Sequence, residues 1–113
     1  MTRISTHVLD SGQGKPVNGM EITLSRIVEG RRVELARERT ANNGRIENLC
    51  AANGVLEEGA YCLHFATGKY FINNNISVFY PYVDVVFNIG GDQTSYHIPL
   101  VFSAFGYSTY MGA

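Results

Sequence analysis

Apolar and polar residues alternate with a period of two along most of the chain, as at Ile4, Thr6 and Val8. Because successive side chains of a strand point to opposite faces, this period predicts strands that each bury one face in a core. A helical period is nearly absent, and only residues 69–75 are expected to form a helix, a short one. The predicted strands occupy residues 4–9, 20–25, 33–36, 61–66, 83–89, 96–102 and 105–110.

Turn-forming residues separate these strands. Residues 42–44, Asn-Asn-Gly, give the clearest turn signal, because Asn and Gly tolerate the positive φ that tight hairpin turns demand. Strands spaced by turns throughout a chain of this length predict an all-β fold, specifically an antiparallel two-sheet β-sandwich. The chain has no internal repeat, linker or low-complexity tract, so we expect one domain spanning residues 1–113.

Composition and charge narrow the possible partners. Nine Lys and Arg against ten Asp and Glu give the 113 residues a net charge of −1, so we expect no nucleic-acid partner and no anionic membrane partner. The apolar runs are far shorter than the ~20 residues that span a bilayer. The N-terminus lacks the apolar region of a secretory signal, and Cys50 and Cys62 read as buried free thiols. These features predict a cytoplasmic protein, provided that no leader has been removed.

Three histidines are the first candidates for acid–base chemistry, because imidazole titrates near neutral pH. His97 precedes Pro99, which breaks a sheet ladder, so a cleft can open beside it. His7 lies on the first predicted strand, and His64 reads as a structural or exposed residue. Arg45 directly follows the central turn and offers a planar fork of donors. Taken one at a time, each of these residues is better explained structurally than catalytically.

Other chemistries lack their motifs. No GxSxG sequence surrounds Ser103 or Ser108, so neither is expected to be an activated nucleophile. No HxH, HExxH or CxxC sequence occurs, so a transition-metal site would need distant residues to converge, and we expect none. Residues 12–15, Gly-Gln-Gly-Lys, are too short for a phosphate-binding loop and no helix is predicted after them.

A series of separated motifs spans nearly the whole chain. They lie at Ile4–Asp10, Gly14–Pro16, Gly44–Ile46, Thr67–Phe71, Phe79–Pro81, Val83–Phe87, Tyr96–Leu100 and Gly106–Tyr110. Together they resemble the transthyretin-like 5-hydroxyisourate hydrolases, and because they follow the order of that family, the resemblance is far more specific than any single match.

The resemblance implies a set of functional residues. The family's catalytic histidine of the first strand, arginine after the central turn and histidine of the penultimate strand fall on His7, Arg45 and His97. It also implies that Tyr110 and Ser108 of the closing motif bind substrate together with His7 and Arg45. The thyroid-hormone carriers of the family replace the last histidine and the closing tyrosine, whereas this chain keeps both.

The implied reaction is hydrolysis of 5-hydroxyisourate to 2-oxo-4-hydroxy-4-carboxy-5-ureidoimidazoline, with no metal or organic cofactor. One of His7 and His97 takes a proton from the attacking water, and the other orients the water or serves the leaving nitrogen. The sequence does not show which histidine is the base. Similar proteins are homotetramers, dimers of dimers whose active sites lie at the dimer–dimer interface. The main alternative is a carrier that binds an aromatic or apolar ligand in the same channel, and a sandwich without any small-molecule site is the third interpretation.

Two departures from the family pattern qualify the resemblance. The hydrolases usually end in Tyr-Arg-Gly-Ser, whereas this chain has Met111 in place of the arginine and Ala113 in place of the serine. Ser95 stands where many members have a further histidine. If the missing arginine touches substrate, Met111 weakens activity or changes the preferred ligand. If it only braces an interface, Met111 is tolerated.

Overall fold

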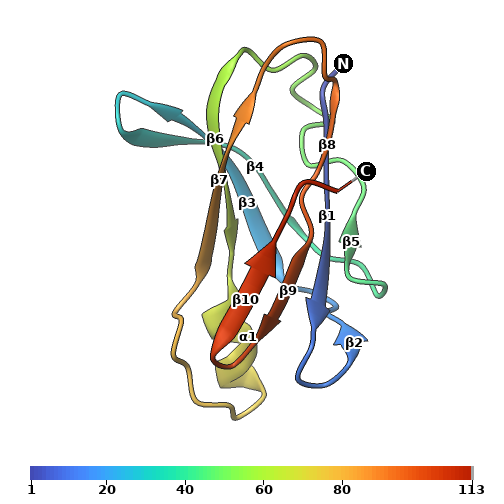
Figure 1. Ribbon diagram of the computed structural model, residues 1–113, viewed down its shortest axis with the longest axis vertical. Coiled ribbons are helices and arrows are strands. Elements are labelled where there is room, and N and C mark those ends of the chain that lie inside the picture. Colours follow the sequence, from blue (N-terminus) through green and yellow to red (C-terminus); the bar gives the residue numbers. More distant parts are fainter. Residues whose placement is uncertain (113) are drawn as a thin grey trace.

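The computed structural model describes residues 1–112, so Ala113 lies outside the described residues. Its strands form two sheets that face each other, with one helix at one end (Figure 1). The elements, in chain order, are β1 (Arg3–Asp10), β2 (Lys15–Pro16), β3 (Glu21–Val28), β4 (Arg31–Arg39), β5 (Arg45–Ile46), β6 (Gly59–Phe65), α1 (Thr67–Asn73), β7 (Val83–Ile89), β8 (Ser95–His97), β9 (Leu100–Ser103) and β10 (Gly106–Thr109).

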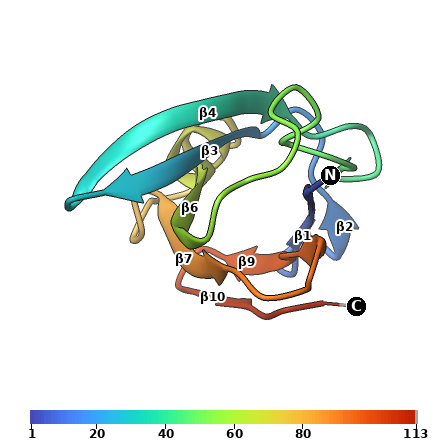
Figure 2. The same cartoon turned by 90° about the horizontal axis from the view of Figure 1, so that it is seen from above.

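The strands confirm the predicted β-sandwich. One sheet has the order β4-β3-β6-β7 and is antiparallel throughout. The second has the order β10-β9-β1-β2, with β5 and β8 also paired to β1, and the two layers are seen edge-on in Figure 2. This second sheet is not purely antiparallel, because β1 runs parallel to β8 and β9. Only short hairpins impose antiparallel pairing, and β1 is separated from β8 by the whole of the other sheet.

The core lies between the sheets and takes the side chains that the alternation predicts. Ile4, Thr6 and Val8 of β1 are fully buried, and the intervening residues are partly exposed. Thr6 is the polar exception in this row, and its hydroxyl donates to the carbonyl of Ile98 at 2.6 Å, so no hydrogen bond is lost on burial. From the facing sheet come the equally buried side chains of Ile22, Leu24, Tyr61, Leu63 and Phe65.

The helix begins and ends two residues earlier than predicted. It starts at Thr67, and its second residue, Gly68, packs directly against the carbonyl of Pro81, where any Cβ would collide with that oxygen. It ends at Asn73, and two residues later Asn75 adopts the positive φ of 58° that Asn tolerates better than most residues.

A proline interrupts the strand predicted at 96–102. β8 ends at His97 and β9 begins at Leu100, because Pro99 between them cannot donate to a sheet ladder. His97 therefore lies at the end of a strand. Both cysteines are buried free thiols, as the sequence predicts.

Candidate active site

Three strands form the platform of the candidate site. β1 lies in the middle, with β5 on one edge and β8 on the other (Figure 1). The alternation that buries Ile4, Thr6 and Val8 turns the odd-numbered residues of β1 to the opposite face. Register then fixes their neighbours, because His7 is paired with Arg45 of β5 and Ser5 with His97 of β8. Residues far apart in the sequence thus share one face.

His97 is held from two sides. Its Nδ1 lies 2.8 Å from Oγ of Ser5, and its backbone carbonyl accepts a hydrogen bond from the N–H of Gly112 at 2.7 Å. A Cβ at position 112 would lie 2.6 Å from Cδ2 of the imidazole, so only glycine fits there. The C-terminal segment thus packs against the ring, and Ser5 fixes the ring's orientation.

Arg45 is positioned by the central turn. Gly44 has a φ of +78°, and a Cβ there would lie 2.5 Å from the carbonyl oxygen of Val8, so glycine lets the turn approach β1 closely. The side chain of Asn43 accepts a hydrogen bond from the N–H of Arg45 at 3.0 Å. The carbonyl of Asn43 accepts one from Nε2 of His7 at 2.9 Å. One turn therefore orients both residues.

A polar cleft of about 450 Å³ opens over this platform. Burial lowers the pKa of the His97 imidazole below its ordinary value, and the positive charges of Arg45 and His7 lower it further. A histidine in these surroundings is uncharged at neutral pH and can accept a proton. The cleft is lined by Arg3, Ser5, Thr6, Arg45, Ile46, Glu47, Gln93, Ser95, His97 and Gly112.

The structure brings together some of the predicted site residues and not others. Arg45 and His97 line the cleft, whereas His7 lies beside it, turned toward the carbonyl of Asn43. Ser108 is exposed on β10, and Tyr110 lines a separate, apolar groove of about 300 Å³ together with Met111. Within one chain, Ser108 and Tyr110 therefore do not reach the cleft that holds His97.

Sequence reasoning missed most residues of the cleft wall, among them Arg3, Ser5, Glu47 and Gly112. Arg3 and Ser5 share the outward face of β1 with His7, so the period of two already put them on the same strand face as this predicted site residue. Glu47 follows two residues after Arg45, and Gly112 belongs to the closing motif. Their spacing was visible in the sequence, but the pairing that brings them to His97 was not.

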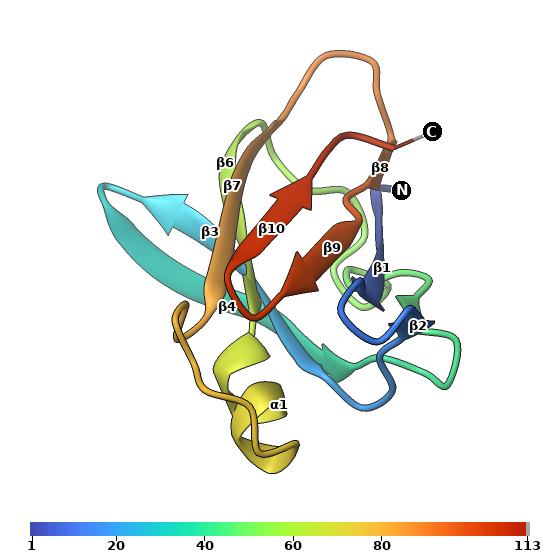
Figure 3. The same cartoon turned by 60° about the horizontal axis from the view of Figure 1, so that its bottom comes forward.

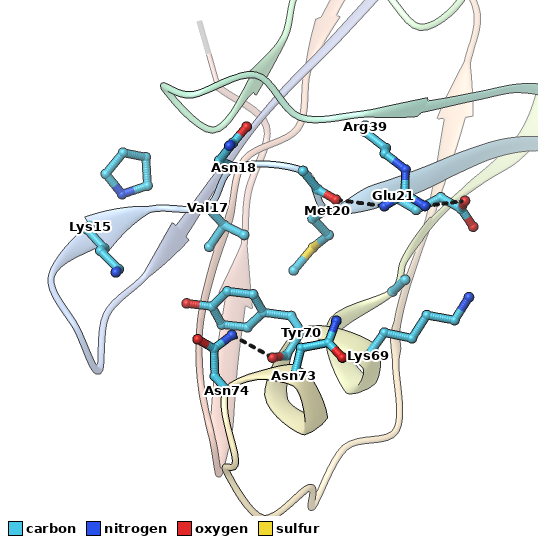
Figure 4. A pocket seen from close by; sticks show the side chains of 13 residues that line it. Lys15, Val17, Asn18, Met20, Glu21, Arg39, Lys69, Tyr70, Asn73 and Asn74 are labelled. Carbon is cyan, nitrogen blue, oxygen red and sulfur yellow. Dashed lines mark hydrogen bonds and ion pairs between the residues drawn. The ribbon is translucent and has the colours of Figure 1, made fainter.

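A second hollow, of about 490 Å³, lies between α1 and the start of β3 (Figure 4). Lys69 and Tyr70 line it from the helix, and the ion pair between Arg39 and Glu21, at 3.6 Å, lines the opposite wall. Burial and a hydrogen bond to Asp10 raise the pKa of Tyr70 to about 12, so this hydroxyl stays protonated and structural. This hollow contains no histidine and none of the predicted site residues.

Residues 1–112 contain neither a cluster of metal ligands nor a membrane-spanning helix. In this part of the chain, no three His, Cys, Asp or Glu side chains gather in a way that would hold a metal ion. No helix among the same residues is long and apolar enough to cross a membrane.

Comparisons with known proteins agree with the motifs. A probable 5-hydroxyisourate hydrolase of Caenorhabditis elegans is 38% identical over 110 residues, covering 97% of this chain and 80% of that protein. The structure of Klebsiella pneumoniae 5-hydroxyisourate hydrolase is similar at a TM-score of 0.87 and 35% identity, over 100% of both chains. Sea bream transthyretin in complex with thyroxine is similar at a TM-score of 0.90 and 25% identity, over 98% of this chain and 95% of that chain.

The family assignment rests on nearly the whole sequence. The model of the HIUase/Transthyretin family matches residues 4–112, which include every motif quoted from the sequence. The chain belongs to the HIUase/Transthyretin family.

Proposed function

We propose that this chain hydrolyses 5-hydroxyisourate to 2-oxo-4-hydroxy-4-carboxy-5-ureidoimidazoline. The single observation that carries the proposal is the polar cleft in which an uncharged His97 and the guanidinium of Arg45 share one face. The relatives named as 5-hydroxyisourate hydrolases match this chain over nearly its full length, which supports the same activity here.

The chemistry is the opening of a cyclic amide by water. The water oxygen bonds to the amide carbonyl carbon, the C–N bond breaks, and the ring nitrogen receives a proton. The products of the cleavage are a carboxyl group and a ureido group on the same molecule. A base that takes a proton from the water and a cation that stabilises the oxygen during attack are therefore the two groups the reaction needs.

We assign the base to His97. A proton on its Nδ1, donated to Oγ of Ser5, leaves the lone pair of Nε2 free to take a proton from water. His7 is less suited to this role, because its Nε2–H donates to the carbonyl of Asn43 and its ring does not line the cleft. In this scheme His7 orients the water or serves the leaving nitrogen.

Arg45 supplies the cation. Its guanidinium lies on the cleft wall next to His97, close enough for its charge to lower the pKa of the imidazole. A planar fork of donors suits the carbonyl oxygens of the substrate and the negative charge that grows on one of them during attack.

We also propose a homotetramer, a dimer of dimers in which Tyr110 and Ser108 reach the cleft of another subunit. β7 and β10 are the outer strands of the two sheets and lie side by side (Figure 3), and such edges carry unpaired backbone groups. Large apolar side chains are exposed along them: Val86 is 59% exposed and Tyr107 is 44% exposed. Light scattering on the purified protein should give a mass of four times the 12.5 kDa chain.

The carrier alternative uses the same fold, so fold similarity to transthyretin does not exclude it. A carrier of an apolar ligand does not need an uncharged imidazole beside a guanidinium in a polar cleft. The apolar groove that holds Tyr110 and Met111 is the surface on which such a ligand would have to bind.

We expect the cytoplasm as the compartment, since the two buried free thiols suit reducing conditions.

The test is the decay of ultraviolet absorbance of 5-hydroxyisourate generated in situ by urate oxidase. We expect the protein to accelerate the decay well beyond the uncatalysed rate. The same rate with and without protein, from a folded tetramer, would refute the hydrolase and shift the function to ligand binding. Acceleration would also establish that Met111 is compatible with catalysis.

A further inference from the structure

A second guanidinium lies on the cleft wall and has no role in the reaction as derived so far. Arg3 is on the outward face of β1, two residues before Ser5 and four before His7, and it lines the cleft. In register it is paired with Ser95, just as Ser5 is paired with His97. The Ser5–His97 pair is therefore bracketed along β1 by Arg45 on one side and Arg3 on the other.

Glu47 holds the guanidinium of Arg3 in place. Nε of Arg3 donates to the backbone carbonyl of Glu47 at 3.0 Å, and Nη2 donates to its carboxylate at 3.0 Å. Nη1 of Arg3 makes no hydrogen bond to any atom of residues 1–112. Arg3 and Glu47 both line the cleft. A guanidinium that is held by two hydrogen bonds and still has unused N–H donors can bind a further acceptor without losing side-chain freedom.

We propose that Arg3 is a second substrate-binding residue, which donates from Nη1 to a carbonyl oxygen at the end of the substrate opposite to the end that Arg45 binds. Glu47 is its positioning residue. This inference rests on the proposed function and adds to it the recognition of a bicyclic substrate.

The backbone spacing of the two arginine positions along β1 suits such a substrate. Arg45 is paired with His7, four residues from Arg3 along β1, which corresponds to about 13 Å of extended chain. Both arginines are long and can lean toward the His97 between them. A bicyclic ring system with an oxygen at each end can then accept one hydrogen bond of ~2.9 Å from each arginine.

Binding of this kind acts on the ground state and the transition state alike, because the bonded oxygen lies away from the scissile bond. Loss of Arg3 should therefore raise KM and leave kcat close to that of the parent. For an exposed charge-assisted hydrogen bond we expect an effect of about tenfold.

The experiment compares Arg3→Gln, Arg3→Lys and Arg26→Gln with the parent. Arg26 is a matched control, because it also donates to a glutamate carboxylate, that of Glu57 at 3.0 Å, and to a backbone carbonyl, but on the other sheet. Hydrolysis of 5-hydroxyisourate gives KM and kcat for each variant. Calorimetric titration with urate, a bicyclic relative that lacks the 5-hydroxyl group, measures binding without turnover.

We expect Arg3→Gln to raise KM and to weaken urate binding about tenfold, with partial recovery in Arg3→Lys and no change in Arg26→Gln. Unchanged KM and unchanged urate binding in Arg3→Gln would overturn the role of Arg3 and leave the hydrolase standing. Equal losses in Arg3→Gln and Arg26→Gln would also overturn it, because they would reflect a general effect of surface charge. Absence of hydrolysis by the parent refutes the proposed function itself.

Discussion

His64 and His97 are both partly buried histidines on strands, but the groups around them carry opposite charges. Nδ1 of His64 lies 2.7 Å from one carboxylate oxygen of Asp84, and the other oxygen accepts a hydrogen bond from Arg32 at 2.8 Å. Nδ1 of His97 lies 2.8 Å from the hydroxyl of Ser5, and burial together with the charge of Arg45 lowers the pKa of its imidazole. Among residues 1–112, no carboxylate is bonded to His97.

This difference separates a structural histidine from a candidate base. Both carboxylate oxygens of Asp84 accept hydrogen bonds. Burial raises the pKa of this carboxyl, but the hydrogen bonds from Arg32 and His64 lower it, and the net result is a pKa below the ordinary value. The result is an ion-paired network on the outside of one sheet. Burial and the charge of Arg45 instead keep His97 uncharged beside an open cleft, where a lone pair of its imidazole can accept a proton.

Exchanging each histidine for asparagine should give opposite outcomes. His97→Asn removes the base, and we expect the rate of 5-hydroxyisourate hydrolysis to fall by ~10²–10⁴, with little change in unfolding midpoint. His64→Asn should leave the rate unchanged. Absorbance decay and urea unfolding of the two variants measure both quantities, and equal activity of His97→Asn and the parent would break the comparison.

Removing the carboxylate should affect only the structural histidine. Asp84→Asn leaves Arg32 and His64 without their shared acceptor, and we expect a loss of about 1–3 kcal/mol in the free energy of unfolding at pH 7. Because the pKa of this carboxyl is lowered in the folded state, its contribution is present above the ordinary value of about 3.9 and is lost as the pH falls through the lowered pKa. Urea unfolding at several pH values should therefore show the gap between Asp84→Asn and parent closing in acid.

Removing the hydroxyl should affect only the candidate base. Ser5→Ala leaves Nδ1 of His97 without its partner, so the ring can rotate and change tautomer. We expect kcat to fall about five- to tenfold with KM unchanged, consistent with the loss of one hydrogen bond. Ser103→Ala is the matched control, since that hydroxyl donates to the carbonyl of Gly106 away from the cleft. A normal kcat in Ser5→Ala would argue against the orientation proposed for His97.

The smallest expected effect concerns the pH profile. The acid limb of kcat/KM should lie below the ordinary histidine value of about 6.5, because the free enzyme must have His97 uncharged. The negative charge of Glu47 raises the pKa of His97, so Glu47→Gln should move this limb to lower pH. Glu57→Gln, on the other sheet, should leave the limb in place. A limb that moves upward in Glu47→Gln would contradict this electrostatic account.

Much of the fold followed from the alternation of residues. The buried row Ile4, Thr6 and Val8 was predicted because one strand face meets the core whatever its partners are. The parallel pairing of β1 with β8 and β9 could not be predicted, since it joins segments about 90 residues apart and leaves no local signal. The helix was misplaced by two residues because Ala66, the residue before it, has no side chain that can cap a helix and so mark its start.

The candidate site was predictable as residue types but not as an arrangement. His7, Arg45 and His97 came from the resemblance, because nothing local distinguishes His97 from His64. The environments of His97 and His64 depend on strand register, which brings Ser5 to His97 and Asp84 to His64. Arg3 was missed for the same reason, since its position in the cleft follows from the pairing of three strands.

The central claim is that His97 is the base of the cleft because its surroundings keep it uncharged. A nitrogen-15 NMR titration of the histidine side chains, assigned with the His97→Asn variant, tests this most directly. The account predicts that His97 titrates below about 6.5 and that its neutral form carries the proton on Nδ1. A His97 that titrates above that value, or whose neutral form carries the proton on Nε2, would contradict it.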